Sequence, residues 1–254
     1  MSDYIEKYKR RMTRTGNDVG EAYTNNTIAF IEANFKSSPT YRLLKVFSSE
    51  YPEIKEMDSR VVEVERMGSL REIIFMPNQS LETGTYIQFD GDTWLLFDKY
   101  GGTGSTSVKM LAQKCNRKLK WKDKEGKLHE WDCIAGSTDI GSKAKQNRTE
   151  IEWNKYDVRL PIGQLFVFVE ANSETKKIQL NQRFIFGDNA FEVIGRDDVT
   201  GITKTGYGVI QLVIKIDTKR VVEDDFENGI AFNDYKETGT GDTGGSGDTG
   251  GSPW

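Results

Sequence analysis

The sequence has a single histidine, His129, and only two cysteines, Cys115 and Cys133, among its 254 residues. These numbers exclude a disulfide-rich scaffold, a histidine-rich metal site and any mechanism that needs two histidines. No apolar run approaches the roughly 18 residues that span a bilayer, and residues 1–7 lack the apolar stretch of a signal peptide. The sequence therefore predicts a soluble protein that is made in the cytoplasm and has no membrane partner.

The sequence also lacks an excess of positive charge. The sequence has 35 lysines and arginines and 39 aspartates and glutamates, which gives a net charge of −4. No global basic field exists to drive sequence-independent DNA binding, so a histone-like or membrane-surface protein is excluded. At about 150 residues per domain, the length predicts two domains, or one large β domain with appendages.

The first 38 residues differ in period from the rest of the chain. Apolar side chains recur at helical spacing over residues 4–12 and again over residues 19–35, and Asn17-Asp18 is a suitable cap between them. We expect two helices, or one helix that is broken near Gly16. Two interpretations remain open for residues 1–38: a helical pair that packs on its own domain, or an arm that reaches a neighbouring subunit.

From Tyr41 onward the apolar period changes from 3.6 to 2, which indicates an all-β body. Early strands are expected over residues 42–47, 61–65 and 72–76. The clearest hairpin covers residues 86–97, because the Asp-Gly pair at its centre accepts the positive φ angles of a tight turn. A second hairpin is expected over residues 115–134.

Comparison of the sequence with itself indicates a tandem repeat. Residues 87–97 align with residues 184–194 at a constant offset of 97, and each segment is followed by a polar loop and another strand. Hairpins converge easily on such patterns, so chance similarity is the alternative. We predict a mainly β fold, namely two tandem antiparallel β-barrel-like units behind a short N-terminal helical segment. The expected divisions are a helical arm (1–38), a first β unit (39–140), a second β unit (149–236) and a flexible Gly/Thr/Ser/Asp tail (237–254).

No pattern of catalytic or metal-ligating residues emerges. The Asp-Thr-Gly triplets at 242–244 and 248–250 match aspartic proteases, but they lie in the predicted linker without flanking apolar strands. Cys115, His129 and Cys133 lack close Cys-x-x-Cys spacing and a fourth zinc ligand. The basic residues of the 114–127 segment could touch phosphate, but the acidic residues alongside favour a charge-paired hairpin. We therefore predict no enzyme activity, no metal and no cofactor.

Three segments together resemble a known group of proteins. They are residues 84–96 (GTYIQFDGDTWLL), residues 113–121 (QKCNRKLKW) with the Glu125-Gly126 turn, and residues 198–212, which end in VIQL. In combination they are similar to minor virion proteins of tailed phages of Gram-positive bacteria, in particular to head–tail connector or head-closure components. The resemblance covers roughly residues 40–235, and it brings no catalytic motif.

The resemblance implies a virion structural protein that forms a homo-oligomeric ring, joins the portal to the tail or adaptor proteins, and helps to retain packaged DNA near its channel. A tail-tube or baseplate protein and a monomeric β binding module are the alternatives. Two long polar loops and the N-terminal tyrosines are the expected assembly contacts. The candidate residues are Tyr4, Tyr8, Gly101, Gly102, Thr103, Gly104, Asp198, Thr200, Thr203 and Lys204.

Overall fold

The structure is a computed structural model that describes residues 4–8, 16–49, 53–64, 68–100, 106–136, 163–219 and 221–235. The expected tail at 237–254 and the loop tip at 101–105 lie outside the described residues. Residues 4–8 are helical. The remaining elements are α2 (Val19–Asn34), β1 (Tyr41–Phe47), β2 (Lys55–Glu63), β3 (Leu70–Phe75), β4 (Tyr86–Phe89), β5 (Asp92–Tyr100), β6 (Lys109–Lys114), β7 (Arg117–Lys122), β8 (Leu128–Gly136), β9 (Gln164–Glu170), η2 (Thr175–Lys177), β10 (Arg183–Phe186), β11 (Asn189–Asp197) and β12 (Val209–Ile216).

The first β unit is a closed barrel with the strand order β1-β2-β3-β6-β5-β4. Antiparallel pairing of β1 with β4, in which Val46 lies opposite Ile87, closes it. Alternate residues along β1 point inward, so Leu44 and Val46 are fully buried while Leu43 and Lys45 face outward. The period of two in the sequence therefore marks the barrel wall correctly.

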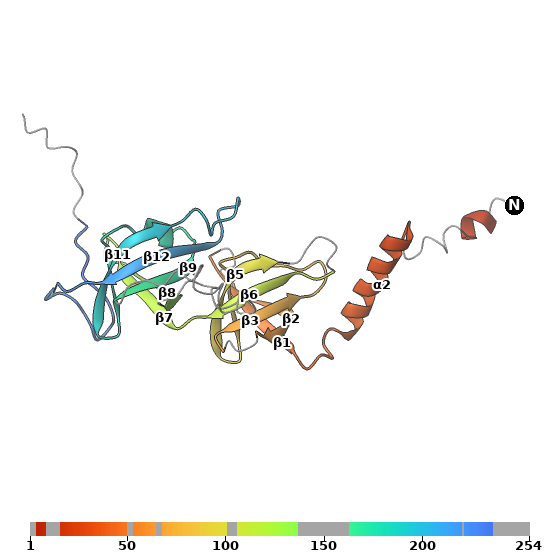
Figure 1. Ribbon diagram of the computed structural model, residues 1–254, viewed down its shortest axis with the longest axis horizontal. Helices are drawn as coiled ribbons and strands as arrows, with labels where there is room; N and C mark the ends of the chain where they lie inside the picture. Colours follow the sequence, from red (N-terminus) through yellow and green to blue (C-terminus); the bar gives the residue numbers. More distant parts are fainter. Residues whose placement is uncertain are drawn as a thin grey trace, which may run out of the picture.

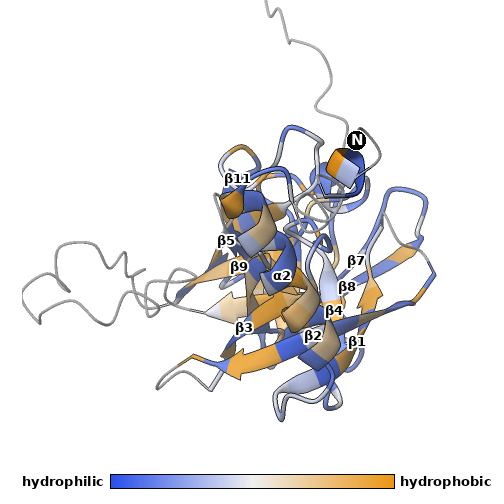
Figure 2. Ribbon diagram, turned by 90° about the vertical axis from the view of Figure 1, so that its right-hand side faces the viewer, coloured by the Kyte–Doolittle hydropathy of each residue, from blue (hydrophilic) through white to orange (hydrophobic). Residues whose placement is uncertain are grey.

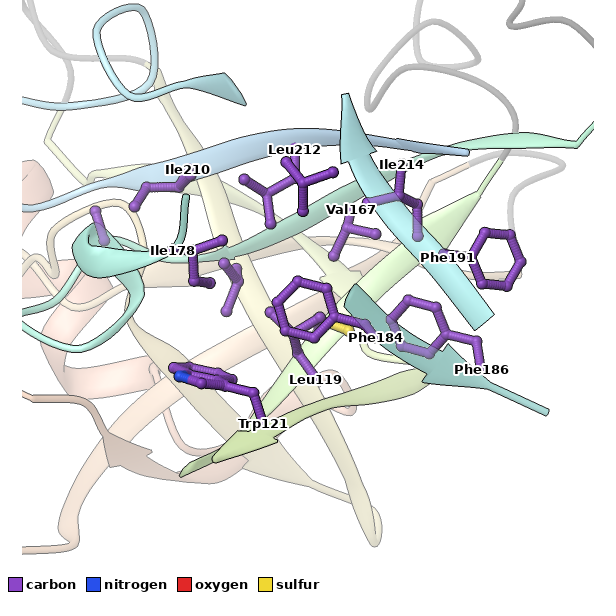
Figure 3. Close-up of a cluster of buried hydrophobic side chains, with 14 residues drawn as sticks. Leu119, Trp121, Val167, Ile178, Phe184, Phe186, Phe191, Ile210, Leu212 and Ile214 are labelled. Atoms are coloured by element: carbon purple, nitrogen blue, oxygen red, sulfur yellow. The ribbon is translucent and has the colours of Figure 1, made fainter. Parts of the chain in front are cut away.

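The second β unit repeats this order as β7-β8-β9-β12-β11-β10. Its core is a continuous cluster of aromatic and aliphatic side chains, among them Trp121, Phe184 and Ile214 (Figure 3). Here β10 lies against β7, but the two strands form no ladder. The two units therefore share one topology, and they differ in how the last strand meets the first.

The tandem repeat predicted from the sequence is confirmed by the register. The tight turns at residues 90–91 and 187–188 join β4 to β5 and β10 to β11, at the predicted offset of 97. Each long strand also carries a bulge at the matching place, between Leu96 and Asp98 in β5 and between Val193 and Gly195 in β11. Chance similarity of two hairpins does not produce a matched bulge and a matched strand order.

The change from one sheet to the other falls at Cys115-Asn116, whereas the expected division lies between residues 140 and 149. The β7–β8 hairpin, expected in the first unit, belongs to the second sheet because β8 pairs with β9, with Ile134 opposite Phe168. Local sequence shows that two strands form a hairpin, but it does not show which sheet the hairpin joins.

The two units meet at a buried junction around Tyr86. Its ring stacks on Phe47 and Trp131, its hydroxyl donates to the Asp132 carbonyl at 2.5 Å, and the Glu170 amide donates to that hydroxyl at 3.3 Å. Burial raises the pKa of Tyr86 well above its ordinary value, so the phenol stays protonated and can donate. Two units held by packed aromatic rings and buried hydrogen bonds form one elongated body (Figure 1).

Residues 221–235, here called the C-terminal strap, cross the open side between β10 and β7. Arg183 of β10 binds Asp224 of the strap through both terminal nitrogens, at 2.7 and 2.8 Å, and binds Asp217 through Nε at 2.6 Å. At the other side, the Tyr235 hydroxyl donates to the carbonyl of Lys122 in β7 at 2.6 Å. The strap thus links the two strands that form no ladder with each other.

Candidate assembly interface

Helix α2 begins at a strong N-terminal signal. Asp18 has an extended backbone and accepts a hydrogen bond from the Glu21 amide at 2.8 Å, while the Glu21 carboxylate accepts one from the Asn17 amide at 2.8 Å. The first bond satisfies an amide that the first helical turn leaves unpaired, and the second holds the residue before the cap. The cap predicted at Asn17-Asp18 is confirmed, and Glu21 is its second half.

None of the 16 residues of α2 is buried. Val19, Tyr23 and Phe30 lie on one face at helical spacing, and they are 83%, 77% and 69% exposed. Both acidic side chains of the helix, Glu21 and Glu32, lie on the opposite face. The helix therefore has an apolar side that its own chain leaves uncovered, and the interpretation of a helical pair packed on its own domain is wrong.

The attachment of α2 to the barrel is confined to its last turn. Phe35 is fully buried, the Arg60 guanidinium lies 4.6 Å from the centre of its ring, and Arg60 donates to the carbonyls of Phe35 and Asn34 at 3.1 and 2.8 Å. From this anchor the helix projects away from both units, and residues 4–8 lie at the far end of the molecule (Figure 1). Seen from that end, α2 carries both hydrophilic and hydrophobic segments (Figure 2). We call residues 4–8 and 16–35 the arm.

The predicted contacts Tyr4 and Tyr8 are both exposed in the arm. The tyrosines do not lie beside the predicted contacts at residues 198–204, which belong to the connection between β11 and β12 in the second unit. Gly101, Gly102, Thr103 and Gly104 lie outside the described residues. The structure thus divides the described candidates between two separate surfaces.

The β11–β12 connection is well ordered by its own hydrogen bonds. Asp197 accepts from the amides of Val199 and Thr200, each at 2.9 Å, and the Thr203 amide donates to the Tyr207 carbonyl at 2.7 Å. These contacts place the exposed Val199 at the surface. Around it lie the predicted contacts Asp198, Thr200 and Lys204, which are exposed, and Thr203, which is half-buried.

A buried histidine lies between two carboxylates in the second unit. His129 Nε2 forms a hydrogen bond with Asp123 Oδ2 at 2.8 Å, and Nδ1 lies 2.8 Å from Glu174 Oε2, an ion-pair contact that does not meet hydrogen-bond geometry. Burial of the ring disfavours its charged form, but the two carboxylates outweigh burial and raise the pKa of His129 above 6.5. The hydrogen bond from His129 in turn lowers the pKa of Asp123. Sequence reasoning missed this cluster, because Asp123 lies in the β7–β8 turn, His129 in β8 and Glu174 just before η2.

The basic hairpin is charge-paired, as the nearby acidic residues indicated. Glu130 binds Lys118 at 2.6 Å and Lys120 at 3.5 Å, and Lys127 binds Glu174 at 3.2 Å. Among the described residues, no group of three or more histidine, cysteine, aspartate or glutamate side chains could hold a metal ion. Within the same residues, no helix has the length and apolar content to cross a membrane.

Comparison with known families gives one match, and it covers the second unit. Residues 117–215 match the model of the YomX C-terminal domain, a phage-derived protein family. The match begins at the first residue of β7 and ends within β12, so its bounds agree with the sheet topology. The second unit is therefore similar to a phage-associated domain.

Other comparisons add no functional information. No curated protein matches the chain. Among solved structures, the chain is similar to MrkH, a c-di-GMP-dependent transcription regulatory factor, at 8% identity and a TM-score of 0.21, covering 78% of this chain and 85% of that one. It is also similar to the complex of K. pneumonia MrkH with c-di-GMP, at 9% identity and the same TM-score, covering 78% and 87%.

Proposed function

We propose that this chain is a structural protein of the phage virion, which forms a homo-oligomeric ring at the head–tail connector and joins the portal to tail or adaptor proteins. The observation that carries the proposal is helix α2 of the arm, a capped helix with none of its 16 residues buried. A monomeric binding module has no use for such a helix, whereas a ring subunit uses it to hold its neighbour. The resemblance of residues 84–96, 113–121 and 198–212 to connector proteins supports the location.

The energetics of α2 favour a partner. Most helical stability in proteins comes from burial of an apolar face and not from intrinsic propensity, and α2 buries none of its residues. Full burial of a large apolar side chain contributes about 1.5–3 kcal/mol, so covering Val19, Tyr23 and Phe30 would stabilise the assembly by roughly 5–9 kcal/mol. That gain is large enough to order the arm between two subunits.

The body of the molecule suits a load-bearing role. The two units are joined at Tyr86 by stacked rings and buried hydrogen bonds, so the subunit resists bending between them. The ordered β11–β12 connection presents Val199 as a contact for the portal or a tail protein. With a net charge of −4, the ring would retain packaged DNA by narrowing the channel and not by general attraction.

Sedimentation velocity of the full chain over a range of concentrations tests the oligomer. We expect a defined oligomer that dissociates when Tyr23 and Phe30 are both replaced by serine, while circular dichroism shows an intact β body. The matched control is Leu180→Ser, which removes another exposed apolar side chain from the second unit. A chain that stays monomeric at all concentrations would contradict the ring.

Electron microscopy of virions carrying a gold label at the C-terminus of this chain tests the location. Label at the junction of head and tail supports the connector, whereas label along the tail or at its tip assigns the chain to the tail tube or the baseplate. Absence of label from intact virions would contradict a structural role.

A further inference from the structure

A groove lies at the end of the second unit, between the C-terminal strap and the turn that joins β7 to β8. Its volume is about 570 Å³, within the range of roughly 300–1,000 Å³ that is typical of ligand pockets. Ile230, Phe232 and Tyr235 supply its apolar part. Phe232 is 45% exposed, although its backbone is held by Asp224 and Arg183. The groove therefore offers an apolar surface on a well-anchored segment.

The strap side of this groove is acidic. Glu223, Asp225 and Asp234 line it, and the strap as a whole has five acidic residues and no basic one. Lys122 and Lys124 on the opposite wall offset this charge only in part. A partner for the groove should accordingly combine aromatic or aliphatic side chains with positive charge.

The N-terminal segment of this same chain has that chemistry. Residues 1–15 contain five basic residues against two acidic ones, and they include the aromatic side chains Tyr4 and Tyr8. Both tyrosines are exposed, so neither is used by its own subunit. Residues 1–15 and the groove are thus complementary in charge and in apolar character.

The positions of the two surfaces exclude a contact within one subunit. The arm leaves the first barrel at one end of the elongated molecule, and the strap lies at the opposite end, beyond the second unit (Figure 1). Helix α2 carries residues 4–8 farther outward, since 16 residues at 1.5 Å each extend about 24 Å. The occupant of the groove must come from a second copy.

We propose that Tyr4 and Tyr8 of one subunit bind in the strap groove of the next subunit, and that the net positive charge of residues 1–15 adds attraction to the acidic side of the groove. This inference deepens the proposed function, on which it rests, by naming the surface that receives the arm. The contact is head-to-tail, because two different surfaces of the chain meet. Repetition of such a contact generates a ring when the rotation closes.

The first experiment compares two phenylalanines of the strap in the full chain. Phe232→Gln changes a groove residue, whereas Phe226→Gln is the matched control, because Phe226 is equally exposed, at 47%, but does not line the groove. We expect Phe232→Gln to weaken subunit association about tenfold or more in sedimentation velocity, as an anchor residue does. Phe226→Gln should leave association unchanged.

A second experiment alters the other partner and the charge. Replacing Tyr4 and Tyr8 by serine touches neither barrel, and it should weaken association as much as Phe232→Gln does, with no further loss when the changes are combined. Glu223→Lys should also weaken association, and high salt should reduce the difference between it and the wild type. A fluorescent peptide of residues 1–15 added to the full chain should bind and dissociate the oligomer.

The outcomes separate this inference from the proposed function. An oligomer that needs Tyr23 and Phe30 but tolerates Phe232→Gln and Glu223→Lys overturns the groove and leaves the ring in place. Equal effects of the two phenylalanine substitutions also overturn the groove, because they point to general damage of the strap. A chain that never associates overturns the proposed function itself.

Discussion

Substitution of Gly84 by alanine tests the junction between the two β units. Gly84 has a φ of 88°, and a Cβ atom at this position would lie 1.9 Å from the carbonyl oxygen of Gly208 in the second unit. The atoms that this Cβ would meet are all backbone atoms of Gly208, so no side-chain rotation can relieve the overlap. Gly208 is closely packed as well, since a Cβ atom at this position would lie 2.0 Å from the Gly201 carbonyl oxygen. The two units must move apart to accept the methyl group.

A matched control separates this close approach from backbone strain. Gly91 has nearly the same φ, 85°, but nothing lies within 4 Å of its Cβ position. Left-handed backbone costs a residue with a side chain about 1–2 kcal/mol, which is the expected loss for Gly91→Ala. Overpacking adds about 1–3 kcal/mol, so Gly84→Ala should reduce the free energy of unfolding by roughly 2–5 kcal/mol.

Differential scanning calorimetry of the two variants measures this difference. Each kcal/mol corresponds to about 2–4 °C for a chain of this size, so Gly84→Ala should melt several degrees below Gly91→Ala. Equal melting temperatures would refute the reasoning, because they would mean that the two units do not approach each other closely at Gly84.

Three further predictions concern the second unit. The pKa of His129 is raised, so the stability that protonated His129 contributes is complete below pH 6.5 and is lost as pH rises through the folded-state pKa. Thermal melting from about pH 6 to about pH 9 should show this loss of stability. In the variant His129→Gln the loss should be absent. Replacing Arg183 by methionine leaves the almost fully buried Asp224 without its ion-pair partner. We therefore expect the free energy of unfolding in urea to fall by about 3–5 kcal/mol. A smaller decrease would show that the Arg183 ion pair contributes little to holding the strap. Cys115 and Cys133 should stay reduced. Because burial raises the pKa of both thiols, an alkylating reagent should modify them slowly until the protein is unfolded, and mass spectrometry measures the extent of modification. A disulfide between the two cysteines would contradict this prediction.

The features that the sequence predicted correctly depend on local rules. The Asp90-Gly91 turn is local chemistry, since both residues adopt the positive φ angles that a two-residue hairpin requires. The cap at Asp18 and the period of two in β1 are local in the same sense. The tandem repeat was detectable because the second copy keeps the spacing of its hairpin, turn and following strand.

The sequence by itself thus determined the elements, their repeated order and the β character of the body. Only the tertiary structure decided that the β7–β8 hairpin joins the second sheet, that His129 lies between Asp123 and Glu174, and that the strap forms a groove beside β7. These features bring together residues far apart in the chain, and local patterns contain no information about such contacts. The arm shows the same division, because helical spacing predicted α2, but only the exposure of Val19, Tyr23 and Phe30 in the folded chain showed that its apolar face is free to bind a partner.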